Sequence, residues 1–316
     1  MRPWNSPCRS LLLIFIGTLI MMTPSAQAAP KDIHYRTVKV DGIDIFYREA
    51  GDPKAPTILL LHGFPTSSHM FRDLIPLLAD RFHLIAPDYP GFGYSECPPV
   101  DKFEYTFDHL TDVMEHVVDA LGLTRYALYM QDFGGPVGFR LATRRPTQVR
   151  ALIIQNANAY DEGVSQGVKD VVLRVWQERT PESEARLKQL FELSATKRQY
   201  LEGVPDPSKV SPDAWEHAQW GMDRPGNKEI QFVLHANYGS NIERYEEWHA
   251  YFHKYQPPTL ITWGKGDFVF LPAGAEAYRK DLKQVELHML DAGHFALETN
   301  AVEIAAFIRA FRPLQQ

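Results

Sequence analysis

Residues 126–136 read Tyr-Ala-Leu-Tyr-Met-Gln-Asp-Phe-Gly-Gly-Pro, and this stretch decides the fold. It opens with a short, largely apolar run, which is typical of a strand buried on both faces of a sheet. A helical pattern begins at about Gly135 and is halted by Pro146. Between the two lies a tight turn with Asp132 in the middle and a glycine two residues later, where the helix packs hard against the turn. The stretch therefore predicts a strand, a nucleophile elbow and a helix, with Asp132 as the nucleophile.

A second loop follows an earlier buried run. Residues 57–61 are apolar and end at His62-Gly63-Phe64-Pro65. In folds with a nucleophile elbow, one backbone N–H from such a loop and one from the residue after the nucleophile form an oxyanion hole. We therefore expect the amides of Phe64 and Phe133 to be the two donors. Pro65 cannot donate a hydrogen bond, but it can fix the turn.

Two late strands supply an acid and a histidine. Residues 262–267 (Thr-Trp-Gly-Lys-Gly-Asp) end one predicted strand with Asp267, and residues 290–295 (Leu-Asp-Ala-Gly-His-Phe) end the next with His294. The competing position for the acid follows the predicted strand 151–154, but it reads Gln-Asn-Ala-Asn and has no carboxylate. Asp267 is therefore the favoured acid, and the candidate catalytic residues are Asp132, Asp267 and His294.

Taken together, these motifs resemble the α/β-hydrolase superfamily, in the branch with an aspartate nucleophile, namely epoxide hydrolases and haloalkane dehalogenases. The chain order of nucleophile, acid and histidine is that of the superfamily. The loop 62–65 resembles the oxyanion loop of epoxide hydrolases, and residues 131–135 are similar to the dehalogenase elbow. Residues 87–95 resemble a turn-rich loop of the same families. Met130 departs from the serine version of the elbow, which has glycine there.

The resemblance implies a two-step reaction on a tetrahedral carbon. A carboxylate needs no deprotonation, so Asp132 can displace a leaving group and form an ester. Water activated by His294 then attacks that ester, while Asp267 holds the imidazole and stabilises its charged form. The amides of Phe64 and Phe133 would stabilise the oxyanion of this second step.

The fold class expected from the whole pattern is α/β, a mostly parallel α/β-hydrolase sheet flanked by helices. A hairpin is expected over 38–47, around Asp41-Gly42. The alternation of strands and helices breaks between about 161 and 255, and this Tyr- and Trp-rich stretch is interpreted as an inserted helical lid. The expected domains are a first core part at 29–160, the lid at 161–255 and a second core part at 256–316. Strands are expected at 57–61, 83–86, 126–130, 151–154, 259–263 and 285–290, and helices at 106–121, 135–145, 168–178, 182–193, 229–236, 243–255 and 301–311.

The leaving group separates the two enzyme classes. Dehalogenases place a Trp after the nucleophile and a second Asn or Trp donor around the departing halide. Phe133 and Phe64 have no side-chain N–H to offer, although lid tryptophans could supply one. An epoxide oxygen needs a proton donor instead, and the lid tyrosines Tyr200 and Tyr238 are the first choices for that role. The interpretation favours an epoxide hydrolase; the alternatives are a haloalkane dehalogenase and a non-catalytic secreted binding protein with this fold.

The first 28 residues are interpreted as a signal peptide. Arg2 and Arg9 precede an apolar run over 11–22, and Ala26-Gln27-Ala28 is a cleavage signal. The run is shorter than the roughly 20 residues needed to cross a membrane. We therefore expect an exported protein, periplasmic or secreted, that begins at Ala29 and keeps no stable membrane anchor.

Composition limits the partners. The chain has 316 residues and a net charge of −6, with 33 Lys and Arg against 39 Asp and Glu. Without a cationic surplus nucleic-acid binding is not expected. No metal and no cofactor are expected; His249 and His253 stand four apart on a predicted helix but lack the glutamate of a zinc-binding H-E-x-x-H motif. The expected partner is a small apolar substrate, and nothing in the sequence indicates an oligomeric state.

Overall fold

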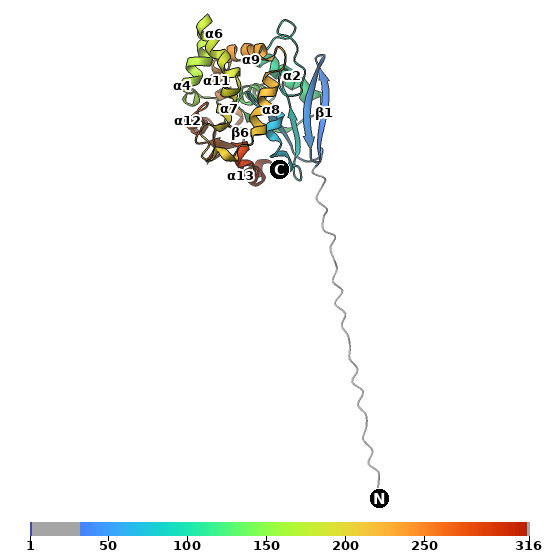
Figure 1. Ribbon diagram of the computed structural model, residues 1–316. Coiled ribbons are helices and arrows are strands. Elements are labelled where there is room, and N and C mark those ends of the chain that lie inside the picture. Colours follow the sequence, from blue (N-terminus) through green and yellow to red (C-terminus); the bar gives the residue numbers. More distant parts are fainter. Residues whose placement is uncertain (2–31, 315–316) are drawn as a thin grey trace.

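The computed structural model describes Met1 and residues 32–314, so the predicted signal peptide lies outside the described residues apart from Met1. Within this range the chain forms a sheet of eight strands flanked by helices, in the order β1-β2-β4-β3-β5-β6-β7-β8 (Figure 1). The six strand predictions are confirmed to within a few residues. The strands are β1 (Ile33–Val40), β2 (Ile43–Ala50), β3 (Thr57–Leu61), β4 (His83–Pro87), β5 (Tyr126–Gln131), β6 (Val149–Gln155), β7 (Thr259–Gly264) and β8 (Val285–Leu290).

The sheet is parallel from β3 to β8 and antiparallel at one edge. β1 and β2 form the predicted hairpin, in which Val40 pairs with Ile43. Asp41 and Gly42 both have positive φ, at 51° and 80°, which is the conformation that a two-residue hairpin turn requires. β2 then pairs antiparallel with β4. Because the remaining strands are parallel, their carboxyl ends lie along one edge, where ligands bind in sheets of this kind.

Helices cover both faces of the sheet and bury alternate residues of each strand. Leu59 and Leu61 of β3 face the cluster built with α2 and α3, while Ile58 and Leu60 face the cluster built with α1 and α13. Thr106 caps α2 by accepting a hydrogen bond from the His109 amide. These helices are α1 (Ile75–Leu78), α2 (Phe107–Ala120), α3 (Gly134–Arg144), α12 (Pro272–Ala277) and α13 (Leu297–Ala310).

The segment between β6 and β7 is helical. Three of its helices, α7, α8 and the single-turn α10, were not among the sequence expectations. α7 buries only Thr196 and Tyr200, so it has no apolar stripe to recognise. α8 begins with Ser211 as N-cap and Pro212 at the first turn, a start signal that could have identified it. The helices are α4 (Gln166–Val168), α5 (Arg174–Gln177), α6 (Pro181–Lys188), α7 (Leu193–Leu201), α8 (Pro212–Met222), α9 (Asn227–Ala236), α10 (Gly239–Ile242) and α11 (Tyr245–Tyr255).

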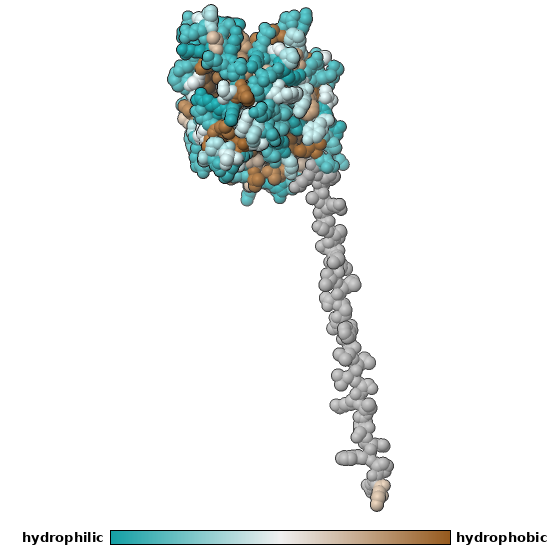
Figure 2. Space-filling model, viewed as in Figure 1, coloured by the Kyte–Doolittle hydropathy of each residue, from teal (hydrophilic) through white to brown (hydrophobic). Residues whose placement is uncertain are grey.

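The surface in Figure 2 is mostly hydrophilic, with small separate apolar areas. No helix in the described part of the chain is both long and apolar enough to span a membrane.

The predicted elbow joins β5 to α3. Asp132 has a backbone φ of 48°, a left-handed conformation that residues other than glycine rarely adopt. Two residues on, a Cβ on Gly134 would lie 2.2 Å from the carbonyl oxygen of Leu61, at the end of β3. Only glycine lets α3 begin this close to the neighbouring strand.

Replacing Gly134 by alanine should therefore destabilise the protein, by about 1–3 kcal/mol, because the new methyl group meets the backbone of β3. Gly167→Ala is the matched control, since a Cβ there has nothing closer than the Ser165 hydroxyl at 3.8 Å. Urea unfolding of the two variants measures the difference. Equal stability of both would mean that the elbow tolerates a side chain at Gly134.

Candidate active site

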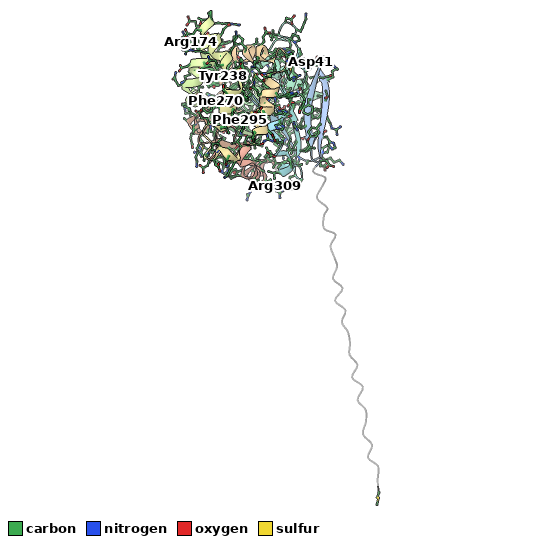
Figure 3. All side chains as sticks on the ribbon, viewed as in Figure 1. Asp41, Arg174, Tyr238, Phe270, Phe295 and Arg309 are labelled. Atoms are coloured by element: carbon green, nitrogen blue, oxygen red, sulfur yellow. The ribbon has the colours of Figure 1, made fainter. Side chains whose placement is uncertain are left out.

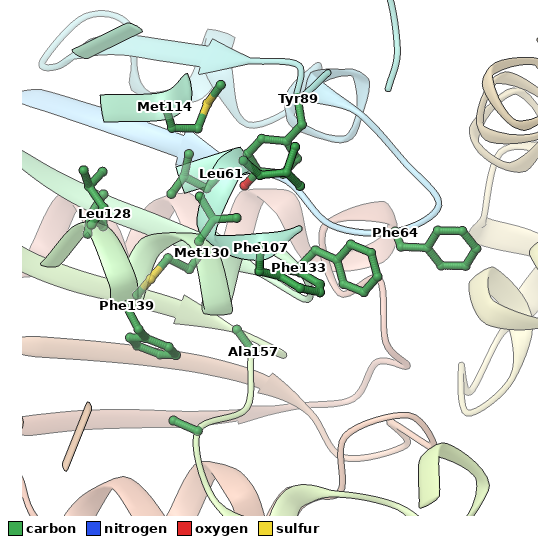
Figure 4. Close-up of a cluster of buried hydrophobic side chains, with 14 of the residues drawn as sticks. Leu61, Phe64, Tyr89, Phe107, Met114, Leu128, Met130, Phe133, Phe139 and Ala157 are labelled. Carbon is green, nitrogen blue, oxygen red and sulfur yellow. The ribbon is translucent and has the colours of Figure 1, made fainter. Parts of the chain in front are cut away.

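The Asp132 carboxylate lies at the carboxyl end of β5, where it is only 5% exposed. Its Oδ1 accepts a hydrogen bond from the Phe64 amide at 2.7 Å. The Phe133 amide has no hydrogen-bond partner within residues 32–314 and is free to donate. Figure 4 shows the Phe64 and Phe133 side chains next to each other at the edge of the buried core. The structure thus brings together Asp132 and the two amides that the sequence nominated for an oxyanion hole.

Gly63 makes this approach possible. A Cβ on Gly63 would lie 2.3 Å from the Asp132 Cβ and 2.6 Å from the Gln131 side-chain oxygen. Any side chain at this position would push the loop after β3 away from the elbow. The glycine of the loop therefore places the Phe64 amide within hydrogen-bond distance of the nucleophile.

His294 and Asp267 complete the group. His294 Nδ1 lies 2.9 Å from Asp267 Oδ2, and because a carboxylate only accepts, Nδ1 carries the proton. Asp267 Oδ1 accepts from the amides of Val269 and Phe270 at 2.8 and 3.0 Å. On the other side, His294 Nε2 lies 3.6 Å from Asp132 Oδ2. The imidazole therefore presents Nε2 to the nucleophile, across a gap longer than a hydrogen bond.

Asn156 stands where the competing acid would be. Its Nδ2 donates to Asp267 Oδ2 at 2.7 Å, so the position after β6 supports the acid instead of supplying one. Its backbone has φ 46°, and its carbonyl accepts from the Asp132 amide at 3.2 Å. Asn156 thus ties the nucleophile and the acid to one turn.

The two carboxylates control the charge of His294. Burial alone lowers the pKa of a histidine, but the charges of Asp267 and Asp132 and the contacts with both raise the pKa of His294 to about 10. The resting imidazole is therefore protonated at neutral pH. Converting Asp132 to an ester removes one negative charge, so the pKa of His294 must then fall. Loss of the Asp132 charge would therefore favour a neutral His294, which is the form that can act as a base.

Gln131 belongs to the elbow sequence, but no role in the site was predicted for it. It is fully buried, and its Nε2 lies 3.1 Å from His294 Nε2. Its Oε1 has no partner among the described residues. Rotating the amide would present Oε1 to a protonated His294, and the orientation with Nε2 suits the neutral form. Gln131 can therefore satisfy both protonation states of the histidine.

A cavity of about 190 Å³ opens beside Asp132 and Phe133. Its wall is mainly apolar and comes partly from the core and partly from the helices between β6 and β7. Tyr238 and Phe270, which are labelled in Figure 3, both line it. The Tyr238 hydroxyl has no hydrogen-bond partner in the described chain. The remaining lining residues are Phe64, Ser165, Gly167, Val168, Val171, Val172, Leu190, Ala195, Arg198, Gln199, His235, Phe268 and Val269.

The structure separates the two candidate tyrosines. Tyr238 lines the cavity, but Tyr200 does not: it is buried in the cluster on the α13 face of the sheet and stacks on Phe295 at 4.1 Å. Tyr200 is therefore not placed to donate a proton to a substrate in this cavity. Its place in that cluster depends on a tertiary contact with Phe295, which the sequence of the helical segment does not reveal.

The four tryptophans of the helical segment also lie elsewhere. None of them is among the residues that line the cavity. Trp248 packs on Phe139 in the core, and Trp220 is half exposed beside Tyr94. Trp176 packs against Gly239, and Trp215 lies in the α13-side cluster. Among the side chains that line the cavity, Arg198, Gln199 and His235 carry N–H groups, and His235 donates its own to the Gln231 carbonyl.

His249 and His253 have separate hydrogen-bond and ion-pair partners and are not arranged to bind one metal ion together. His249 Nε2 donates to the Ala159 carbonyl at 2.8 Å, whereas His253 pairs with Asp281. Within the described residues no group of three or more His, Cys, Asp or Glu side chains is arranged to hold a metal ion.

Comparison with known proteins identifies the fold family. The family described as alpha/beta hydrolase fold matches residues 56–301. The chain belongs to the α/β-hydrolase fold family. It is 41% identical over 268 residues to an uncharacterised hydrolase of Saccharomyces cerevisiae, an overlap that covers 84% of this chain and 92% of that one.

Dehalogenases are also among the α/β-hydrolase relatives. A haloalkane dehalogenase of Bradyrhizobium diazoefficiens is 42% identical over 126 residues, which is 40% of either chain. The crystal structure of the haloalkane dehalogenase DbeA from Bradyrhizobium elkani superposes with a TM-score of 0.73 at 26% identity and covers 89% of this chain and 99% of that one. The protein is thus a hydrolase of this fold with dehalogenase-like relatives.

The charge arrangement predicts that His294 stays protonated well above the ordinary histidine range, to a pH of about 10. Asp132→Asn should lower the pKa of His294, because the neutral amide no longer favours the imidazolium. Asp281→Asn is the matched control: it removes a carboxylate from His253 and should leave His294 unchanged.

Nitrogen NMR of protein with labelled histidine follows this titration, with the His294 signals assigned by their loss in His294→Gln. A wild-type His294 that titrates near pH 6.5 would contradict the arrangement.

Proposed function

We propose that the protein is an epoxide hydrolase that acts through a covalent ester on Asp132. The observation that carries the proposal is the leaving-group side of the cavity. A phenol, Tyr238, borders it without a hydrogen-bond partner, while the residues of the oxyanion hole are Phe64 and Phe133 and no tryptophan lines the wall. The phenol of Tyr238 can give a proton to an alkoxide, but the wall of the cavity offers a departing halide few N–H donors.

In the first step Asp132 Oδ2 attacks a ring carbon of the epoxide. Oδ1 stays on the Phe64 amide and becomes the carbonyl oxygen of the ester. The bond between that carbon and the ring oxygen breaks, and the oxygen takes the proton of Tyr238. General-acid help of this kind is typically worth about 100- to 10,000-fold in rate.

In the second step water attacks the ester carbon of Asp132. Once the charge of Asp132 is gone, His294 releases its resting proton to solvent. The neutral imidazole then accepts one proton from this water, and the amides of Phe64 and Phe133 stabilise the oxyanion. When the carbon–oxygen bond to the substrate breaks, His294 returns its proton to the departing oxygen. The second water proton restores Tyr238, and His294 takes a proton back from solvent as Asp132 regains its charge. The sum of the two steps is epoxide plus water giving a diol.

We base the proposed lid, substrate class and location of the enzyme on other parts of the chain. The helices over 161–255 would act as a lid, since α4, α7 and α9 contribute walls of the cavity beside Asp132. The apolar wall suits a small apolar substrate, and cleavage after Ala28 would place the enzyme outside the cytoplasm.

A haloalkane dehalogenase is the second candidate, favoured by the 42% identity to the dehalogenase of Bradyrhizobium diazoefficiens. The same Asp132, His294 and Asp267 would serve it, with Arg198 or Gln199 as halide donors. However, Arg198 is more than half exposed and paired with Glu202, so it is poorly placed for a buried anion.

His294→Gln should form the ester and fail to hydrolyse it, because the second step alone needs a base. Intact mass measurement after mixing with a terminal epoxide should show an adduct on Asp132 with the full mass of the substrate, since no atom leaves. A bromoalkane adduct would lack its bromine.

Wild-type enzyme is assayed in parallel on terminal epoxides, bromoalkanes and p-nitrophenyl esters, with diol, bromide and phenol as products. Faster bromide release than diol formation would replace the epoxide proposal with the dehalogenase. Full turnover by His294→Gln, or an adduct on another residue, would exclude the mechanism.

Tyr238→Phe should slow ester formation from an epoxide by at least about 100-fold, because the ring oxygen then leaves without a proton. Tyr200→Phe makes the same change outside the cavity and should leave that rate unaltered. Both are measured as adduct build-up in the His294→Gln background. An equal effect of the two variants would remove Tyr238 from the mechanism.

A further inference from the structure

His235 is a polar side chain in the apolar wall that the proposed reaction does not use. It belongs to α9, is only 3% exposed and lines the cavity. Its ring lies 4.3 Å from that of Phe64 in an edge-on contact and 5.3 Å from that of Phe191. A histidine enclosed by phenylalanines in this way requires a reason beyond packing.

The protonation of His235 follows from its own helix. Nδ1 lies 2.8 Å from the Gln231 carbonyl, and a carbonyl only accepts, so Nδ1 carries the proton. Burial lowers the pKa of His235 to about 4, and it is therefore neutral at pH 7. Nε2 then carries only a lone pair. It has no hydrogen-bond partner in the part of the chain that the structure describes.

An exposed lone pair selects what can lie against it. It repels a halide ion or an alkoxide, and it accepts a hydrogen bond from an O–H or N–H group. Tyr238, in contrast, offers a hydrogen. The Phe133 ring contacts both, at 5.1 Å from His235 and 6.0 Å from Tyr238. The cavity therefore has both a donor and an acceptor beside Phe133.

We propose that the substrate is an epoxide that carries a hydroxyl group close to the ring, and that His235 Nε2 accepts the hydrogen bond of this hydroxyl. This inference rests on the proposed epoxide hydrolysis. Tyr238 serves the ring oxygen, which needs a donor, and His235 serves the hydroxyl, which needs an acceptor. The rest of the substrate is apolar, because much of the remaining wall is aliphatic, with Val168, Val171 and Leu190 among its residues.

The test compares three matched substrates on wild-type enzyme: a terminal epoxyalkane, the same compound with a hydroxyl on the carbon next to the ring, and the methyl ether of that alcohol. The alcohol should have a kcat/KM about tenfold above the epoxyalkane, the size of one hydrogen bond. The ether has an oxygen but no hydrogen to donate, so it should show no such gain.

His235→Phe should abolish the preference for the alcohol, and His235→Gln, which keeps an acceptor, should retain part of it. His249→Phe is the matched control, because His249 stacks on Tyr160 outside the cavity, and it should keep the full preference.

Equal kcat/KM values for the three epoxides on wild-type enzyme, or an equal gain for alcohol and ether, would overturn the role of His235 and leave epoxide hydrolysis standing. Absence of diol from all three would overturn the proposed function itself. The wild-type comparison decides the matter even if a His235 variant fails to fold.

Discussion

A carboxylate that is almost completely buried is the constraint on which this structure depends. Removing a charge from water is costly unless polar groups replace the water, and Asp132 has few of them. The described residues that hold it are the Phe64 amide, on Oδ1, and the imidazole of His294. Neither is a permanent cation such as arginine. Oδ2 lies 3.6 Å from His294 Nε2, beyond hydrogen-bond distance, and it therefore remains able to attack.

The same constraint explains which parts of the sequence were informative. The approach of the loop after β3 to the elbow needs glycine at Gly63, and the packing of α3 on β3 needs it at Gly134. Such close contacts of backbone leave a local signature. The buried strands do so too, because a sheet covered on both faces demands continuous apolar runs. The sheet, the elbow and the grouping of Asp132, Asp267 and His294 could accordingly be predicted.

What could not be predicted depends on contacts between distant segments. Tyr200 and Tyr238 are equivalent as sequence, yet one stacks on Phe295 and the other borders the cavity. Gln131 stood in the quoted elbow motif and His235 in an expected helix, but their roles follow from the atoms that they contact, or do not contact, in the folded chain. α7 was missed because a helix with two buried residues has no periodic pattern.

The charge of Asp132 also links the two chemical steps. It helps raise the pKa of His294, and after burial it is one of the charges that raise the pKa of the Tyr238 phenol well above 10. When Asp132 becomes an ester, its charge no longer raises the pKa of His294 or that of Tyr238. The phenol becomes a better acid while the ring oxygen is gaining charge, and the imidazolium becomes able to lose its proton and serve as the base. A halide needs no proton as it leaves, so a dehalogenase would gain from the second of these changes only. In the proposed reaction, the electrostatic coupling of Tyr238 to Asp132 therefore assists the step in which the epoxide oxygen is protonated.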